Sequence, residues 1–170
     1  MKEISNPAND LNLELWTAPA PVEGARDVAV TAKKKKAGYR TGQKIVVGFR
    51  ASRDCYLTLL NVGTSGKLTV LFPNSLHPDN FIQAARDYRI PEADDDFEYE
   101  LLGPPGVEKL KAVATLKKVM LLESNFAPDG SLFRTVDAAS GARDIGVVQK
   151  KIAAVPKTEW AESECEFSVA

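Results

Sequence analysis

The chain has 170 residues, of which 44% are hydrophobic and 26% are charged, and its formal net charge is −1. This composition is typical of a globular domain that buries its own core, and the near-zero charge argues against nucleic acid or an anionic membrane surface as a partner. No run of about 18 apolar residues occurs, so the sequence predicts no membrane insertion.

The start of the chain is polar. Residues 1–10 contain Pro7 and are predicted to form a flexible leader, and residues 11–170 are expected to form a single β-sandwich domain. No apolar stretch near Met1 fits the core of a signal peptide. A complete chain would therefore be cytoplasmic, whereas a domain cut from an exported protein would belong to the cell envelope. The sequence leaves both origins and the oligomeric state open.

Alternating apolar and polar residues predict the first strands, because successive side chains of a strand point to opposite faces. From Leu11, leucines at every second position are expected to face the core, while Asn12, Glu14 and Trp16 face outward. Residues 17–24 contain two prolines and are predicted to be a loop. Residues 27–31 form a short candidate strand, and Lys33–Lys36 are expected to be a solvated basic loop.

The next strands are the clearest in the chain. In Lys44–Arg50, Ile45, Val47 and Phe49 are expected inward, and Val46 is one apolar residue on the outer face. Residues 55–62 and 68–72 then flank Gly63–Gly66, which predicts a β-hairpin with a turn where glycine supplies a positive φ. Both faces of residues 55–62 are apolar, as in a central strand. Cys55 and Cys165 are expected to be separately buried thiols, although a bridge between them is left open.

Two segments, Pro78–Arg89 and Val107–Leu116, fit either a helix or a strand by periodicity. Residues 96–102 alternate, with Phe97, Tyr99 and Leu101 expected inward.

The C-terminal part changes character. Ile145, Val148 and Ile152 recur at helical spacing, with Asp144 near the start and Pro156 after the end, so one amphipathic helix is predicted over Arg143–Ala154. Residues 160–169 alternate again, with an outward row of glutamates that is typical of a sheet edge or an exposed face. The fold class is therefore mainly β: a two-sheet antiparallel β-sandwich with one amphipathic helix in the C-terminal half.

The titratable residues do not form a catalytic set. His77 is the single histidine, and buried cysteines would be inert partners for it. Ser75, His77 and Asp79 are neighbours in one loop, which rarely builds a triad. One histidine and two distant cysteines do not make a zinc site, and residues 94–96 with Glu92 are expected to be a solvated acidic loop. The sequence predicts no catalytic residue, no metal and no cofactor.

Several short pieces, in this order, carry a family resemblance: Tyr39-Arg-Thr-Gly-Gln-Lys44, Arg53-Asp-Cys-Tyr-Leu-Thr-Leu-Leu-Asn61, Gly66-Lys67, Leu71-Phe-Pro-Asn74, Asn80, Tyr88-Arg-Ile-Pro91 and Gly103-Pro-Pro-Gly-Val-Glu-Lys-Leu-Lys-Ala112. Together they resemble the bacterial domain-of-unknown-function family four-three-eight-four over Leu13–Thr115. The resemblance implies a compact β-rich accessory domain, often joined to caspase-like peptidases or protein kinases. It implies no catalytic residue, and it favours an extended form for Phe81–Ile90 and Lys109–Ala114.

We therefore expect a non-catalytic interaction domain that binds a protein partner or its parent assembly. Loops usually carry such sites, and the candidate binding residues lie on two of them: Asn74, His77, Asp79, Asn80, Pro104 and Pro105. The alternative for these residues is that they simply terminate strands. The rival function is a small-ligand or glycan-binding domain, or a hydrolase that uses His77 with Asp79, and a deep pocket holding His77 among carboxylates would favour it.

Overall fold

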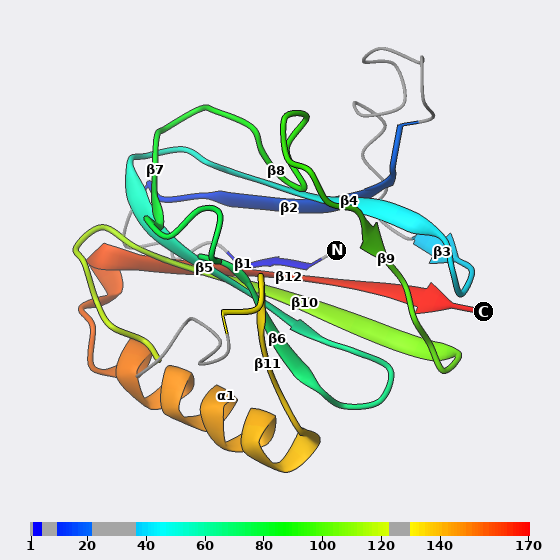
Figure 1. The fold of residues 1–170 in the computed structure, drawn as a ribbon. Helices are drawn as coiled ribbons and strands as arrows, with labels where there is room; N and C mark the ends of the chain where they lie inside the picture. Colours follow the sequence, from blue (N-terminus) through cyan, green and yellow to red (C-terminus); the bar gives the residue numbers. More distant parts are fainter. Residues whose placement is uncertain (1, 5–9, 22–36, 123–129) are drawn as a thin grey trace.

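The computed structural model describes residues 2–4, 10–21, 37–122 and 130–170, which form two β-sheets and one α-helix (Figure 1). The larger sheet contains β1 (Lys2–Ile4), β3 (Ala37–Tyr39), β5 (Cys55–Val62), β6 (Leu68–Phe72), β7 (Phe81–Ile82), β10 (Gly106–Thr115), β11 (Arg134–Val136) and β12 (Trp160–Val169). The smaller sheet contains β2 (Leu13–Pro19), β4 (Lys44–Ala51), β8 (Tyr88–Ile90) and β9 (Tyr99–Glu100). The α-helix is α1 (Ala138–Ala153), and a 3₁₀ turn follows at Lys157–Glu159.

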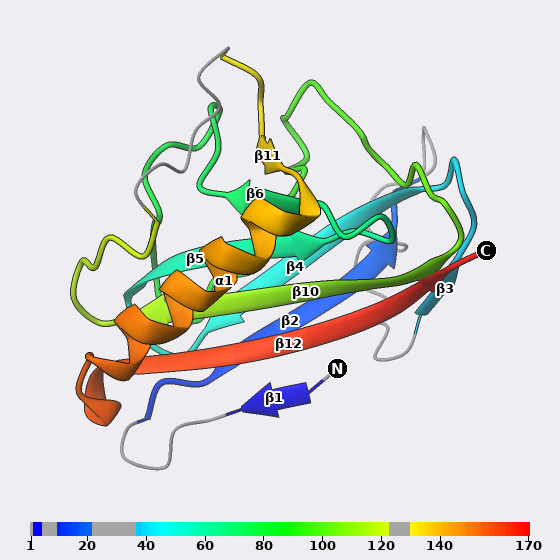
Figure 2. The same cartoon turned by 90° about the horizontal axis from the view of Figure 1, so that it is seen from below.

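The larger sheet has the order β1-β12-β10-β5-β6-β11, and the smaller sheet has the order β2-β4-β8. Among the described strands, every pairing is antiparallel except that of β3 with β12, which is parallel. The sheets stack face to face, and α1 lies across the outer face of the larger sheet (Figure 2). The predicted two-sheet sandwich with one helix is confirmed. Within the described residues, no helix is both long and apolar enough to cross a membrane.

The main core lies between the sheets and follows the predicted alternation. Its buried residues come from every second position of the long strands, and each fully buried leucine, isoleucine or phenylalanine contributes about 1.5–3 kcal/mol. This core includes Leu11, Leu13, Leu15, Ile45, Val47, Phe49, Cys55, Leu57, Leu59, Leu110, Ala112, Ala114, Cys165 and Phe167. Both cysteines are free and buried, as the sequence predicted.

A second core lies under α1 and explains why β5 is apolar on both faces. Leu60 of β5, Leu68 of β6 and Val113 of β10 pack there against Val148 and Ile152 of the helix. The helix approaches the sheet closely at Gly141, where an ideal Cβ would lie 2.7 Å from Leu68 Cβ. The hairpin itself is as predicted, and the positive φ in its turn occurs at Gly66 (85°).

The helix begins at Ala138, earlier than the predicted Arg143. The Asp137 side chain accepts a hydrogen bond from the Ser140 backbone nitrogen at 2.8 Å, so Asp137 is the N-cap. Asp144, which the sequence placed near the start, instead pairs with Arg134 at 3.0 Å. The cap could not be recognised from spacing, because the first turn carries few apolar residues.

The two ambiguous segments are both extended, as the family resemblance favoured. Residues 81–90 form β7 and β8, joined by a turn, and residues 106–115 form β10, which pairs with β5 on one side and β12 on the other. In β10 the alternating set Leu110, Ala112 and Ala114 faces the main core, and Val113 faces the helix.

Four expectations need correction. Lys2–Ile4 pairs with β12 as strand β1, so these residues are not a flexible leader. The first long strand extends through Pro19 into the predicted loop. Of the two alternatives for strand β12, the edge is wrong, because β10 lies on one side and β1 and β3 on the other, whereas the exposed face holds for Glu164 and Glu166. Trp16 and Val46 were placed outward but are buried, with 2% and 4% exposure. The predictions for residues 27–31 and 33–36 lie outside the described residues.

Candidate functional site

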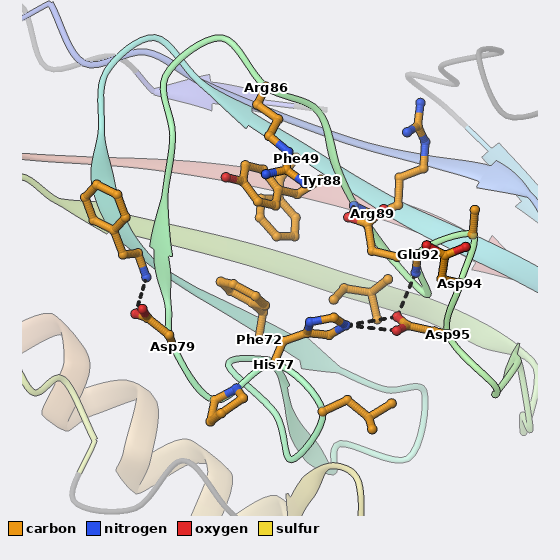
Figure 3. Close-up of a pocket in the computed structure, with 15 residues that line it drawn as sticks. Phe49, Phe72, His77, Asp79, Arg86, Tyr88, Arg89, Glu92, Asp94 and Asp95 are labelled. Carbon is orange, nitrogen blue, oxygen red and sulfur yellow. Dashed lines mark hydrogen bonds and ion pairs between the residues drawn. The ribbon is translucent and has the colours of Figure 1, made fainter.

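A pocket of about 510 Å³ lies between the β6–β7 connection and the segment from β8 to Asp95 (Figure 3). Its base is aromatic and aliphatic, formed by Phe49, Phe72, Tyr88 and Ile90. Two large apolar side chains at its rim are exposed, Leu76 to 52% and Phe81 to 41%. We call this cavity the His77 pocket.

The polar centre of the His77 pocket is the contact between His77 and Asp95. His77 Nε2 lies 3.0 Å from Asp95 Oδ1 and 3.1 Å from Oδ2. The Asp95 side chain is only 10% exposed and also accepts a hydrogen bond from the Glu92 backbone nitrogen at 2.8 Å. The sequence predicted a solvated acidic loop here, which is correct for Asp94 and Asp96 but wrong for Asp95.

Asp79 does not join this pair. Its side chain is exposed and points away from His77, and Oδ1 accepts a hydrogen bond from the Phe81 backbone nitrogen at 3.0 Å (Figure 3). This is a local Asx turn, which shapes the loop. The partnership of His77 with Asp79 that the hydrolase hypothesis required is therefore absent.

Asn74 is a structural residue rather than a binding residue. It is 0% exposed, its Nδ2 donates to the Leu71 carbonyl at 2.8 Å, and its Oδ1 accepts from the backbone nitrogens of Leu76 and His77 at 3.0 and 2.9 Å. Asn80 likewise donates to the Leu57 carbonyl at 3.1 Å. Both asparagines fix the loop that presents His77, and the prediction that Asn74 contacts a partner is wrong because the side chain is enclosed.

The sequence reasoning missed Tyr88 and Arg86. The Tyr88 ring stacks on Phe49 with centroids 5.6 Å apart and planes 6° apart, and Arg86 Cζ lies 4.9 Å from the centroid of the Tyr88 ring. The Tyr88 hydroxyl oxygen accepts from the Gln83 backbone nitrogen at 2.8 Å. Both residues line the pocket because the pairing of β8 with β4 brings Tyr88 beside Phe49. Residue spacing along the chain does not predict a contact between such distant segments.

Pro104 and Pro105 do not line the His77 pocket. They are exposed in the loop before β10, beside the β5–β6 turn, where an ideal Cβ on Gly106 would be 3.4 Å from Thr64 Cβ. This is the end of the larger sheet that also carries the C-terminus (Figure 1). The two loops that the sequence combined therefore do not form one site. A separate cavity of about 390 Å³ at this end has Glu108 in its lining, and we call it the Glu108 pocket.

The ionisable groups that line the His77 pocket are one imidazole, four carboxylates and two guanidinium groups. Among the described residues that line it, none is a serine, threonine or cysteine, so the one hydroxyl in the lining is the phenol of Tyr88. The thiols lie in the core, and burial raises the pKa of Cys55 to about 12. Across the described residues, no three histidine, cysteine, aspartate or glutamate side chains gather as metal ligands.

Comparison with known proteins gives one result. Residues 38–118 match the model of a protein family described as a domain of unknown function, DUF4384. The matched region runs from β3 to the residues just after β10, and so includes the His77 pocket and most of the Glu108 pocket. No curated protein and no solved structure matched the chain.

Proposed function

We propose that this chain, whose residues 38–118 belong to the DUF4384 family, is a non-catalytic binding domain that accepts an apolar side chain of a protein partner in the His77 pocket. The observation that carries the proposal is the pairing of an apolar base with two exposed apolar rim residues, Leu76 and Phe81. Large apolar side chains exposed together at the mouth of a cavity are typical of interaction sites.

The charge of the pocket suggests what surrounds that apolar side chain. Four carboxylates line it, those of Asp79, Glu92, Asp94 and Asp95, against two arginines. Arg89 directs its guanidinium group away from His77, and Arg86 lies over Tyr88 (Figure 3). The exposed carboxylates of Asp79 and Asp94 are thus available to a basic residue next to the inserted side chain. The expected partner segment is apolar with a neighbouring lysine or arginine.

One observation favours the rival function, a small-ligand or glycan-binding domain. A cavity of about 510 Å³ that holds a histidine beside carboxylates has the size of small-molecule sites. Sugars commonly stack on aromatic rings, and two rings of this pocket are already in contact with other side chains. The Tyr88 ring already stacks on Phe49 and has Arg86 over it, so a sugar would have to compete with these contacts. The ring of Phe81 meets that of Tyr56 edge-on at 5.4 Å. An apolar side chain of a protein partner therefore fits the exposed Leu76 and Phe81 better than a sugar does.

A peptide library displayed on phage and selected on the immobilised chain tests the proposal. Enriched peptides should share an apolar residue followed or preceded by a basic one. They should bind at least about tenfold more weakly to a Leu76→Ser/Phe81→Ser variant, because burial of one large apolar side chain is worth about 1.5–3 kcal/mol. The matched control is Val107→Ser/Met120→Ser, which removes two apolar side chains that are 54% and 69% exposed and do not line the His77 pocket.

Equal binding of the selected peptides to both double variants would contradict the proposal. Selection of peptides without any shared motif would do the same. Thermal unfolding of each variant, followed by circular dichroism, shows whether lost binding reflects lost structure. A panel of monosaccharides and short glycans, titrated with the same variants, tests the rival directly.

A further inference from the structure

The Glu108 pocket contains a buried carboxylate that one side-chain hydrogen bond satisfies only in part. Glu108 is 6% exposed, although its neighbours along the same face of β10 are Leu110, Ala112 and Ala114. Burying a charged carboxylate among apolar side chains lowers the stability of the fold unless hydrogen bonds or an opposite charge compensate for the lost hydration. Its hydrogen-bond partner is the amide of Asn61, which is 4% exposed and donates from Nδ2 to Glu108 Oε1 at 3.2 Å. Within the described residues, Glu108 Oε2 has no partner.

Several oxygen atoms border one small space in this pocket. A methyl group built on Gly63 would lie 3.8 Å from Glu108 Oε1 and 3.9 Å from both Asn61 Oδ1 and the Lys67 carbonyl oxygen. Glycine at position 63 leaves this space empty of side-chain atoms. A carboxylate, an amide oxygen and a backbone carbonyl are all hydrogen-bond acceptors, and the one negative charge among them is that of Glu108.

The walls of the cavity suit an alkyl chain. Tyr99, Leu101, Leu102 and Phe133 line it beside the oxygen atoms. A lysine side chain combines an apolar stem with an ammonium group that has three donors and no acceptor. Its charge matches the single buried carboxylate, and its donors match the acceptors beside Gly63.

We propose that the Glu108 pocket binds a primary ammonium group on an alkyl chain, with Glu108 as its counter-ion and Asn61 and the Lys67 carbonyl as further acceptors. The ammonium could come from a lysine side chain of a protein or from a free alkylamine, and the chemistry of recognition is the same. This site is independent of the His77 pocket, which lies at the β7 end of β5 rather than at the β5–β6 turn.

Other charged groups face the same cavity. Glu98 pairs with Lys44 outside it, at a distance of 2.6 Å, and Glu100 adds a second carboxylate at the rim. Lys67 is exposed and is the one basic residue in the lining. Its ammonium group repels an incoming cation, so we expect a Lys67→Gln variant to bind the probes below more tightly than the original chain.

The experiment is an NMR titration of the full chain labelled with ¹⁵N. The probes are Nα-acetyl-lysine methylamide, which represents a protein side chain, and 1,4-diaminobutane, which represents a free amine. Both should shift the amide signals of Gly63, Lys67 and Glu108. The same lysine compound acetylated also at Nε carries no positive charge and should not shift these signals. Whichever amine binds more tightly identifies the source of the ammonium.

Two variants test the geometry. Glu108→Gln keeps the shape and the bond from Asn61 but removes the charge, and should weaken binding at least about tenfold, as expected for a hydrogen bond to a charged group. Gly63→Ala keeps the charge but fills the space between the oxygens, and should also weaken binding. Gly146→Ala is the control, because a Cβ there meets nothing within 4 Å. Absent shifts with both amines, equal binding by Glu108→Gln, or shifts with calcium alone would overturn the proposal.

Discussion

His77 and Asp95, which are 18 residues apart in the chain, hold together the two segments that form the His77 pocket. The imidazole comes from the β6–β7 connection and the carboxylate from the segment after β8, and the His77 Nε2 to Asp95 Oδ1 distance is 3.0 Å. Because Asp95 also accepts from the Glu92 backbone nitrogen, one side chain fixes both its own loop and the opposite wall.

Replacing Asp95 by alanine should therefore destabilise the protein. The change leaves the Glu92 nitrogen and the imidazole without their acceptor, and we expect the free energy of unfolding to fall by about 1–3 kcal/mol. The matched control is Asp94→Ala, in which an exposed neighbouring carboxylate is lost and the change should stay within about 0.5 kcal/mol. Urea unfolding followed by fluorescence measures both. Equal unfolding midpoints for the two variants would show that the contact does not stabilise the fold.

Asn74→Ala should destabilise the chain by about 2–3 kcal/mol, because a fully buried amide makes three hydrogen bonds to the backbone of its own loop. Asp79→Ala, which removes one exposed Asx bond, should cost less than about 1 kcal/mol. Thermal unfolding distinguishes the two. A loss of partner binding in Asn74→Ala would consequently report a deformed loop and not a lost contact. An Asn74→Ala variant as stable as the original chain would refute this structural role.

Gly48→Ala should be destabilising although alanine is the better strand residue. Gly48 pairs with Trp16 across β2 and β4, and an ideal Cβ on it would lie 2.1 Å from Trp16 Cε2. The indole ring must move for the methyl group to fit, and such overpacking costs about 1–3 kcal/mol. Gly146→Ala, on the open face of α1, should instead raise stability by up to about 1 kcal/mol. Calorimetry of both variants checks the contrast, and equal melting temperatures would contradict it.

Glu108 should make stability depend on pH in a defined direction. Burial raises the pKa of the Glu108 carboxyl, and the hydrogen bond from Asn61 opposes this only in part. A raised pKa in the folded state means that the folded chain binds the proton more tightly. The resulting stability is fully present below the ordinary value of 4.5 and is lost as pH rises through the folded-state pKa.

Glu108→Gln should therefore unfold at a higher temperature than the original chain at pH 7.5, by about 2–4 °C if the buried charge costs about 1 kcal/mol. The gain should shrink near pH 4.5, where the original carboxyl is increasingly protonated. Melting curves across this range measure it, with Glu166→Gln as the exposed control from β12. A gain that is the same at both pH values would mean that the carboxyl is not perturbed by burial.

The sequence alone determined the strands with clean alternation and the turn between β5 and β6. In Lys44–Arg50 and Trp160–Val169 the period of two specifies which side chains enter the core, because a strand that slips by one residue exposes its whole apolar set. The amphipathic helix was evident because its apolar residues recur at helical spacing, although its start was not, since the cap at Asp137 is a single polar contact. The family resemblance, rather than periodicity, favoured the extended form of β10.

The tertiary structure alone decided which polar residues meet. The sequence singled out His77, but its partner is Asp95 and not the adjacent Asp79, because the pairing of β8 with β4 brings the later segment across the sandwich. The indole ring of Trp16 lies over Gly48, where any larger residue would overlap it. Asn61 and Glu108 are far apart in the chain and become one site only through the register of β5 with β10. Alternation fixes the side of a sheet on which a residue lies, whereas strand register fixes its neighbours, and register is a property of the whole fold.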